Sequence, residues 1–362
     1  MSPVLPQEIL DADSALHTLF QRVAFSRYLN PINVDEARQD FIAGAEAPPF
    51  RYLRPDWAPE ALELLRGLSV PQLHPFAPLL TEAIGSTILL IEALQSRSSS
   101  AFEALLEHNR WRPDSALLEE ARNQVRKGGS YPFVVSAQQL QQALAEALAE
   151  RGLGEWRVEL DSVMAARVLV DSAKQVLRVN ESARFRQTDA VKLVAHEIDV
   201  HAMRAQNGQR QQLLLFSTGL PGSLETEEGL ALYAEECFGA AAPVNSWRQG
   251  LVVQAVSWAE TMGFRELFER LAEQGGVPLA WGISLRVKRG LRYPDRPGVY
   301  GKDIVYFRGL RVVRRWLQNG GDLSQLYVGK VGVHHPVADW LSEGLVVRGP
   351  VPDLFRGADT TA

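Results

Sequence analysis

Hydrophobic residues recur at helical spacing along the first third of this 362-residue chain. In residues 10–28 they fall three or four positions apart, which predicts a helix. We expect this helix to end before Asn30 and Pro31, because the residue before a proline disfavours the α conformation. Residues 75–95 and 100–109 show the same spacing and predict two further helices. The proline-rich residues 47–52 predict an extended or turning connection.

The middle of the chain combines a helix with a region of alternating pattern. Ser136, followed three residues later by Gln139, predicts a capping box for a helix that runs to Arg151. Hydrophobic and polar residues then alternate in residues 156–160 and 166–180, which are rich in β-branched residues. With a turn at residues 171–173, this pattern predicts an antiparallel hairpin.

Three further helices are predicted in the second half. The first begins near residues 188–189 (Thr-Asp) and ends at residues 207–208 (Asn-Gly), a pair typical of a left-handed stop. The second covers residues 225–238, and the third covers residues 303–318. The chain is therefore expected to be an α+β protein, mostly helical, with a small antiparallel sheet.

The glycine-containing residues 127–130 (Lys-Gly-Gly-Ser) are the best candidate for a domain boundary. We expect residues 1–128 to form a helical region packed on the core, and residues 129–362 to form the catalytic region. Apolar residues 79–94 are interrupted by Glu82, Gly85 and Glu92, so this segment predicts a buried helix rather than a membrane span.

Composition narrows the class of protein. The formal charge is −5, from 38 basic and 43 acidic residues, which offers no general attraction for nucleic acid or an anionic membrane. Cys237 is the single cysteine, so no internal disulfide can form. The first residues lack the basic start and apolar run of a signal peptide. We therefore expect a cytoplasmic protein without a nucleic-acid or membrane partner; the oligomeric state cannot be predicted.

Residues 196–201 (His-Glu-Ile-Asp-Val-His) contain the chemistry expected of a catalytic zinc site. Neutral imidazoles bind zinc and leave a position open for water. A neighbouring carboxylate, here Glu197, can take a proton from that water, whose pKa the metal lowers. Two histidines and a glutamate this close together therefore suggest metal-assisted hydrolysis.

The spacing of the two histidines is unusual for an α-helix. Zinc-binding histidines on a helix normally lie four residues apart, about 40° around the axis. His196 and His201 are five apart, which is roughly 140° on an ideal helix. A π-type turn closes from residue i to i+5 and would bring both to one side. We predict a local distortion, or a helix end near His201; otherwise one histidine is not a ligand.

A third ligand is expected downstream, on another element. Residues 226–231 (Thr-Glu-Glu-Gly-Leu-Ala) supply Glu227 and Glu228, which point about 100° apart on a helix. Only one of the two is expected to face the metal. Other acidic residues of the same segment, including Glu235, are expected to be solvated.

These segments resemble the DUF1704 or QEGLA-motif family, which includes the microtubule-associated tyrosine carboxypeptidases. The family has an HExxxH helix followed by a Gln/Glu-Glu-Gly-Leu-Ala segment, matched here by residues 196–201 and 227–231. Weaker matches extend over roughly residues 30–344: residues 29–33, 49–52, 204, 207–208, 289–290, 302–306, 309 and 329–330.

The resemblance implies a zincin-like core and one Zn²⁺ per chain. It assigns His196, His201 and Glu228 as metal ligands and Glu197 as general base. The implied activity is that of a zinc metallocarboxypeptidase, a hydrolase whose substrate is a peptide or protein C-terminus. The glutamine of the motif name is Glu227 here.

A carboxypeptidase also needs a donor for the oxyanion and cations for the terminal carboxylate. Tyr306 is the candidate oxyanion donor, and Arg204, Arg289 and Lys302 are the candidate cations. Structural roles are equally open: Arg204 can cap its helix or pair with Asp199, and Lys302 can pair with its neighbour.

Two alternative functions remain. The zinc can be structural, in a regulatory protein without hydrolase activity, or the chain can be a zinc amidohydrolase that does not act on peptides. Glu197 favours catalysis, because a structural zinc site needs no base. His334 and His335, followed by a proline, are expected to lie in a surface loop.

Overall fold

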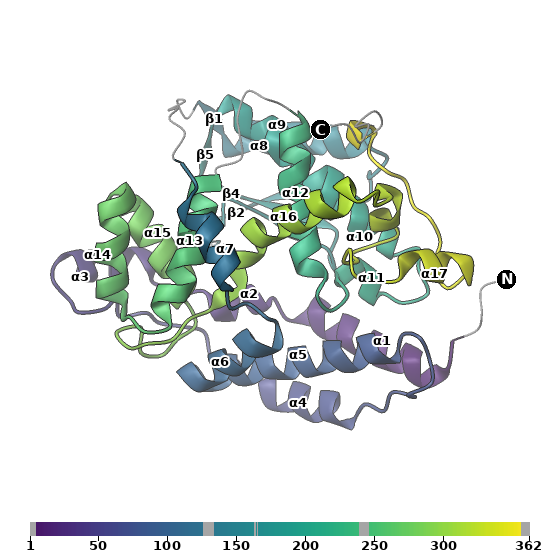
Figure 1. Ribbon diagram of the computed structural model, residues 1–362, viewed down its shortest axis with the longest axis horizontal. Coiled ribbons are helices and arrows are strands. Elements are labelled where there is room, and N and C mark those ends of the chain that lie inside the picture. The colour runs from purple at the N-terminus through teal and green to yellow at the C-terminus, as the bar shows by residue number, and fades with distance from the viewer. Residues whose placement is uncertain (1–4, 126–133, 163, 165, 239–245, 356–362) are drawn as a thin grey trace. The chain divides into compact units, whose positions relative to one another are not determined.

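The computed structural model shows two compact units that are interleaved along the chain (Figure 1). It describes residues 5–125, 134–162, 164, 166–238 and 246–355. Unit 1 consists of residues 1–21, 128–244 and 308–362, and unit 2 consists of residues 22–127 and 245–307. The sequence prediction divided the chain only once, near Gly128. The glycine break at residues 127–130 lies outside the described residues. The assignment of catalysis to residues 129–362 stays a prediction.

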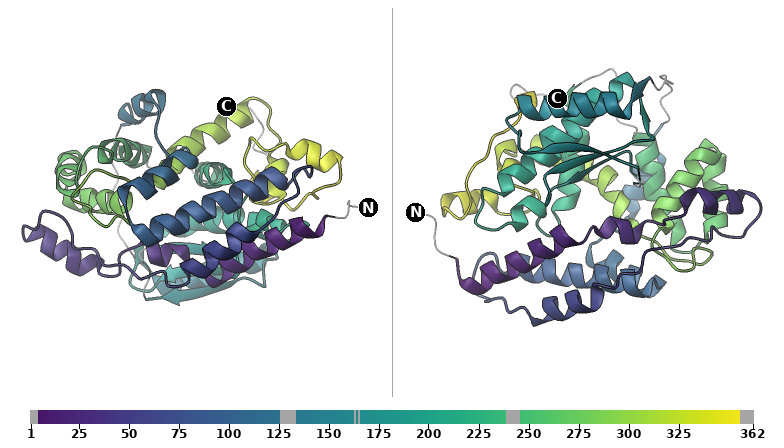
Figure 2. Two further views of the ribbon diagram at one scale, coloured as in Figure 1. Left: turned by 90° about the horizontal axis from the view of Figure 1, so that it is seen from below. Right: turned by 180° about the vertical axis from the view of Figure 1, so that it is seen from behind.

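Unit 1 contains a small mixed sheet with strand order β2-β4-β3 (Figure 2, right). β3 (Val168–Asp171) and β4 (Val176–Asn180) pair antiparallel, with Val170 opposite Leu177, which confirms the predicted hairpin. β2 (Arg157–Asp161) runs parallel to β4, with Arg157 opposite Val176, so the expectation of a purely antiparallel sheet was wrong. A separate antiparallel pair joins β1 (Val135–Ser136) to β5 (Arg184–Phe185).

Helix α8 (Ala137–Glu150) packs against β2 and β4 and begins as predicted. The Ser136 hydroxyl accepts a hydrogen bond from the Gln139 N–H at 3.2 Å, and the Gln139 side chain accepts from the Ser136 N–H at 2.9 Å. This reciprocal capping box satisfies two backbone donors that the helix cannot pair internally. Gly152 follows the helix with a positive φ of 69°.

The segment with the two histidines is continuous with a helix on each side. α9 (Gln187–Leu193) leads into the π-helix η1 (Val194–Ala202), which continues as α10 (Met203–Gly208). The distortion predicted from the five-residue spacing is therefore confirmed. The predicted start was slightly late: α9 begins after Arg186, and Asp189 accepts the Arg186 N–H at 3.0 Å.

The predicted left-handed stop at residues 207–208 was wrong. Gly208 is the last residue of α10, and its φ is not positive. A Cβ there would lie 2.2 Å from the Phe216 carbonyl oxygen, so glycine permits a close backbone approach. The Asn207 amide donates to the carbonyls of Tyr327 and Pro350, at 2.8 and 2.9 Å. This pair therefore connects α10 to later segments of unit 1.

The remaining elements of unit 1 are helical. α12 (Ser223–Phe238) packs against η1 and matches the second predicted helix. α16 (Ile304–Gln318) matches the third predicted helix and follows the 3-10 turn η2 (Gly301–Asp303). Unit 1 begins again at Arg308, within α16, so η2 and the first turn of α16 belong to unit 2. Unit 1 also contains shorter helices: α11 (Leu215–Thr218), η3 (Leu323–Tyr327), α17 (Val337–Ser342) and η4 (Asp353–Phe355).

At the start of the chain, the structure has two helices where the sequence predicted a single helix over residues 10–28. α1 (Gln7–Arg22) ends before Val23, and α2 (Phe25–Leu29) ends before Asn30, whose ψ of 141° is extended. The proline therefore ends the helix as expected. Nothing in the residue types marks the earlier break.

Unit 2 is helical and has its own aromatic-rich core. Its helices are α2, α3 (Val34–Ile42), α4 (Ala58–Gly67), α5 (Ala77–Ser96), α6 (Ser99–His108), α7 (Ser115–Arg122), α13 (Ser246–Ala259), α14 (Phe264–Gly275) and α15 (Val277–Lys288). Phe41 contacts the rings of Phe264 and Phe268 edge to face, at centroid distances of 5.0 and 4.9 Å. The predicted helices at residues 75–95 and 100–109 are confirmed as α5 and α6.

Among the described helices, α5 alone has the length and composition of a membrane span, and 39% of its most apolar window is buried. A core helix of a soluble protein meets the same test. α5 packs against α4 and α6, and Leu80, Ile91 and Leu94 are fully buried, so the predicted buried helix is buried along one face only.

Candidate metal centre

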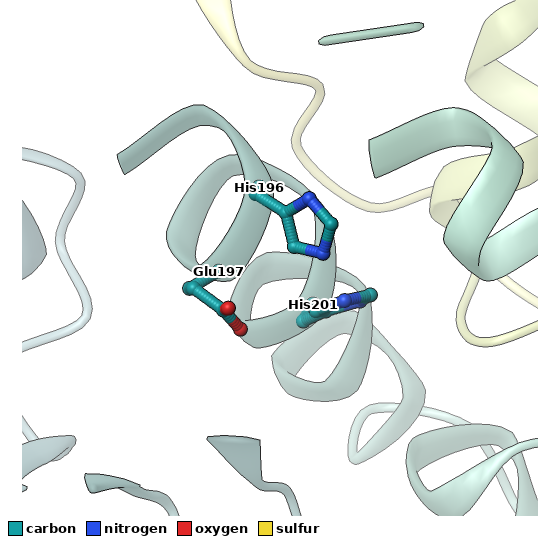
Figure 3. A group of neighbouring side chains, drawn as sticks. All are labelled: His196, Glu197 and His201. Carbon is teal, nitrogen blue, oxygen red and sulfur yellow. The ribbon is translucent and has the colours of Figure 1, made fainter. Parts of the chain in front are cut away.

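The π-helix places His196, Glu197 and His201 on one side of its axis (Figure 3). One ligand atom from each of the three side chains lies within 4.8 Å of the others. The two imidazole rings meet edge to face, with centroids 4.8 Å apart. The i+5 closure of the π-helix explains this convergence, because an α-helix would turn the two histidines away from each other.

Glu228 of α12 faces both histidines. Its Oε2 lies 3.7 Å from the His196 Nε2 and 3.6 Å from the His201 Nε2. These distances are too long for hydrogen bonds, and the buried oxygen has no hydrogen-bond partner among the described residues. Zinc binds such ligands at about 2.0–2.2 Å, and tetrahedral ligand atoms are then about 3.3–3.6 Å apart. The separations of Glu228 from the two histidines are therefore close to those expected for ligands of one ion.

Glu227, the other glutamate of the pair, lies on the opposite side of His201. Its Oε1 contacts the His201 Nδ1 at 2.7 Å and the Lys330 Nζ at 3.0 Å, and its Oε2 accepts a hydrogen bond from the Arg204 guanidinium. The pKa of Glu227 is well below its usual range: burial raises it, but Arg204 and Lys330 outweigh burial. Glu227 is thus an ionised partner of His201 rather than a ligand.

Arg204 is fully buried behind Glu227. Besides Glu227, its guanidinium donates to the carbonyls of Leu326 and Val331, at 2.8 and 2.6 Å. No part of the residue is exposed. A side chain without exposed surface cannot contact the substrate carboxylate as predicted. Arg204 is instead assigned a positioning role. The suggested pairing with Asp199 was also wrong, because Asp199 binds Arg151.

Glu235 was expected to be solvated, but it contacts the other histidine. Its Oε1 lies 2.8 Å from the His196 Nδ1, and its side chain is 16% exposed. Lys192 lies 3.8 Å from its second oxygen. Glu235 follows Glu228 by seven residues, two helical turns that place both on one face of α12. The seven-residue spacing of Glu228 and Glu235 was the sequence signal that could have predicted this contact.

The site attracts positive charge. Burial lowers the pKa of both histidines, but the neighbouring carboxylates outweigh burial; the pKa of His201 is raised, and that of His196 lies well above its ordinary value. Burial raises the pKa of Glu228, but the two histidines hold it well below its usual range. A divalent cation at this position would also neutralise the negative charge of these carboxylates. The donor set of two imidazoles and a carboxylate suits zinc.

The other candidates for substrate binding, Arg289, Lys302 and Tyr306, belong to unit 2. Arg289 donates to Asp303 at 3.2 Å and lies over the Tyr300 ring, with its Cζ 5.1 Å from the centroid. Arg286 contacts both oxygens of Asp303, at 2.7 and 3.0 Å. Asp303 thus has two arginine partners.

His334 and His335 form a packed pair. Their ring centroids are 4.2 Å apart, and the His335 ring stacks on Trp340 at 5.7 Å. The His335 Nδ1 accepts the Gly332 N–H at 2.8 Å. Burial, followed by the charge of His334, lowers the pKa of His335 to about 3, so this imidazole is neutral. The geometry indicates a structural role for His335.

Comparison with known proteins points to one family. The family model described as microtubule-associated tyrosine carboxypeptidase matches residues 115–361. Microtubule-associated tyrosine carboxypeptidase 1 of Mus musculus is 33% identical over 179 residues, which are 45% of this chain and 36% of that protein. The Rattus norvegicus protein of the same name is 29% identical over 221 residues, 57% of this chain and 45% of that protein. The chain therefore spans less than half the length of these relatives.

Proposed function

The chain belongs to the microtubule-associated tyrosine carboxypeptidase family, and on this basis we propose that it is a zinc-dependent carboxypeptidase acting on a peptide or protein C-terminus. The observation that carries the proposal is the convergence of His196, His201 and Glu228 beside the carboxylate of Glu197. The family assignment agrees with the predicted resemblance; the DUF1704 name, like the cytoplasmic location, stays a prediction.

In this proposal His196, His201 and Glu228 hold the metal, and Glu197 is the general base. A bound zinc ion supplies a Lewis acid that polarises the scissile carbonyl and makes water more acidic. The Glu197 carboxylate accepts a proton from the attacking water and delivers it to the leaving amine. Glu197 suits this role because it lies within the same 4.8 Å cluster as the histidines.

The predicted candidates for substrate recognition are kept in this proposal. Tyr306 is proposed to donate a hydrogen bond to the oxyanion, and Arg289 and Lys302 are proposed to bind the terminal carboxylate. Arg289 supports this role because it shares the single carboxylate of Asp303 with Arg286, and its buried Nε has no hydrogen-bond partner among the described residues.

The test is incubation of the zinc-loaded protein with a peptide library, followed by mass spectrometry. We expect loss of single C-terminal residues from free peptides and none from C-terminally amidated peptides. Glu197→Gln is expected to keep its zinc and lose this activity. Turnover in that variant would refute the mechanism, internal cleavage would refute the exopeptidase assignment, and unchanged peptides would favour a regulatory protein or another amidohydrolase.

A further inference from the structure

Two carboxylates outside the ligand set contact the candidate metal-binding histidines from the far side of each ring. The Glu227 Oε1 lies 2.7 Å from the His201 Nδ1, and the Glu235 Oε1 lies 2.8 Å from the His196 Nδ1. We propose that Glu227 and Glu235 are positioning residues that fix the tautomer and orientation of the two imidazoles. The inference rests on the proposed metal site.

These contacts determine which nitrogen of each imidazole ring carries the proton. A neutral ring has one N–H and one lone pair, and a carboxylate at Nδ1 retains the proton there. The lone pair is then on Nε2, the nitrogen that in both rings faces the Glu228 Oε2, at 3.7 and 3.6 Å. The opposite tautomer would direct a proton at the ion. Carboxylate partners also make the ring a stronger ligand.

One helix supplies all three carboxylates. Glu228 and Glu235 are seven residues apart and share a face of α12, whereas Glu227 points about 100° away from Glu228. The π-helix η1, which packs against α12, supplies both histidines. The relative placement of two helices therefore sets the ligands and their supports together.

The two supports differ in how firmly they are held. Glu227 is anchored by the buried Arg204 and by Lys330, so its removal would leave buried cations without a counter-charge. Glu235 is 16% exposed, and the Lys192 side chain, which is 23% exposed, lies 3.8 Å from it. Substitution of Glu235 can therefore change the metal site without disturbing the fold, which makes it the residue to test.

Glu236 provides a matched control. It follows Glu235 directly on α12 and carries the same charge, but both of its oxygens bind Arg314, at 2.5 and 2.6 Å. Zn²⁺ affinity is measured for the 362-residue chain by competition with a chelator, in wild type, Glu235→Ala, Glu236→Ala and Glu235→Gln. Proton NMR of the zinc-loaded proteins detects hydrogen-bonded imidazole N–H groups downfield.

We expect Glu235→Ala to bind Zn²⁺ about 10–100-fold more weakly than wild type and Glu236→Ala to bind as wild type does. The downfield signal of His196 should be present in wild type and lost in Glu235→Ala. Glu235→Gln keeps an acceptor oxygen, so it should recover part of the Zn²⁺ affinity and part of the downfield signal.

Equal Zn²⁺ affinity in Glu235→Ala and Glu236→Ala would overturn the inference and leave the metal site intact. The absence of downfield imidazole signals in zinc-loaded wild type would overturn it without reliance on any variant. A wild-type chain that binds no Zn²⁺ would overturn the proposed function and this inference together.

Discussion

Gly229 of α12 and Gly309 of α16 meet backbone to backbone. A Cβ on Gly229 would lie 2.1 Å from the carbonyl carbon of Gly309, and a Cβ on Gly309 would lie 2.0 Å from the carbonyl oxygen of Glu225. Neither distance is possible for a real side chain, so the crossing requires glycine at both positions. Because α12 also carries Glu227 and Glu228, the crossing helps to set where these carboxylates lie.

Gly229→Ala is therefore expected to destabilise the protein and weaken metal binding. Overpacking of a tight contact typically costs about 1–3 kcal/mol, and α12 must shift to relieve it. Gly282→Ala on α15 is the control, since a Cβ there meets nothing within 4 Å and alanine favours a helix. Urea unfolding and Zn²⁺ titration measure both effects. Equal stability of the two variants would show that the crossing tolerates a methyl group.

Glu227→Gln tests the buried charge cluster behind His201. Arg204 has no exposed surface and the Lys330 side chain is 11% exposed, so loss of the Glu227 charge leaves two cations without a counter-charge. Breaking a buried pair in this way typically costs about 3–5 kcal/mol. Glu236→Gln removes a more exposed charge on the same helix and should cost about 1 kcal/mol or less. Similar losses in urea unfolding would contradict the assigned role of Glu227.

Asp303→Asn is expected to change how stability depends on pH. Burial raises the pKa of Asp303, but Arg289 and Arg286 outweigh burial and lower it to about 2, from 3.8. The folded state therefore holds the carboxylate ionised at pH values where the unfolded chain is protonated. This stabilisation is complete well above pH 4 and is lost as the pH falls toward 2.

The wild-type protein should accordingly be more stable than Asp303→Asn at pH 5. Because about 1 kcal/mol of the Asp303 contribution is lost by pH 3, the gap should narrow by that amount. Urea unfolding of both proteins at the two pH values measures the gap. An unchanged gap would mean that the Asp303 carboxylate has the same pKa in the folded and unfolded chain.

Local sequence signals predicted local structure well. Ser136 and Gln139 are three residues apart, and the capping box depends on that spacing alone, so its prediction is confirmed atom by atom. The five-residue spacing of His196 and His201 likewise led to the π-helix, because an ordinary turn cannot bring both rings together. In each case the interacting groups lie within one or two turns of the chain.

Contacts between segments far apart in the sequence could not be predicted from local residue patterns. The parallel pairing of β2 with β4 depends on the path of the chain and not on the residues of either strand. Asn207 and Gly208 form a pair that often ends a helix in a left-handed conformation. Glycine is instead needed at position 208 because the backbone of Phe216 lies against it. Glu235 has the composition of a solvated position, and only the packing of α12 on η1 brings it to His196.

The central claim is that His196, His201 and Glu228 hold one metal ion. Native mass spectrometry of the purified 362-residue chain, after loading with Zn²⁺ and removal of the excess, counts the ions bound to each chain. We predict one Zn²⁺ on wild type, one on Glu225→Ala and none on Glu228→Ala, with circular dichroism showing that all three are folded. A wild-type chain without Zn²⁺, or a folded Glu228→Ala chain that retains it, would contradict the claim.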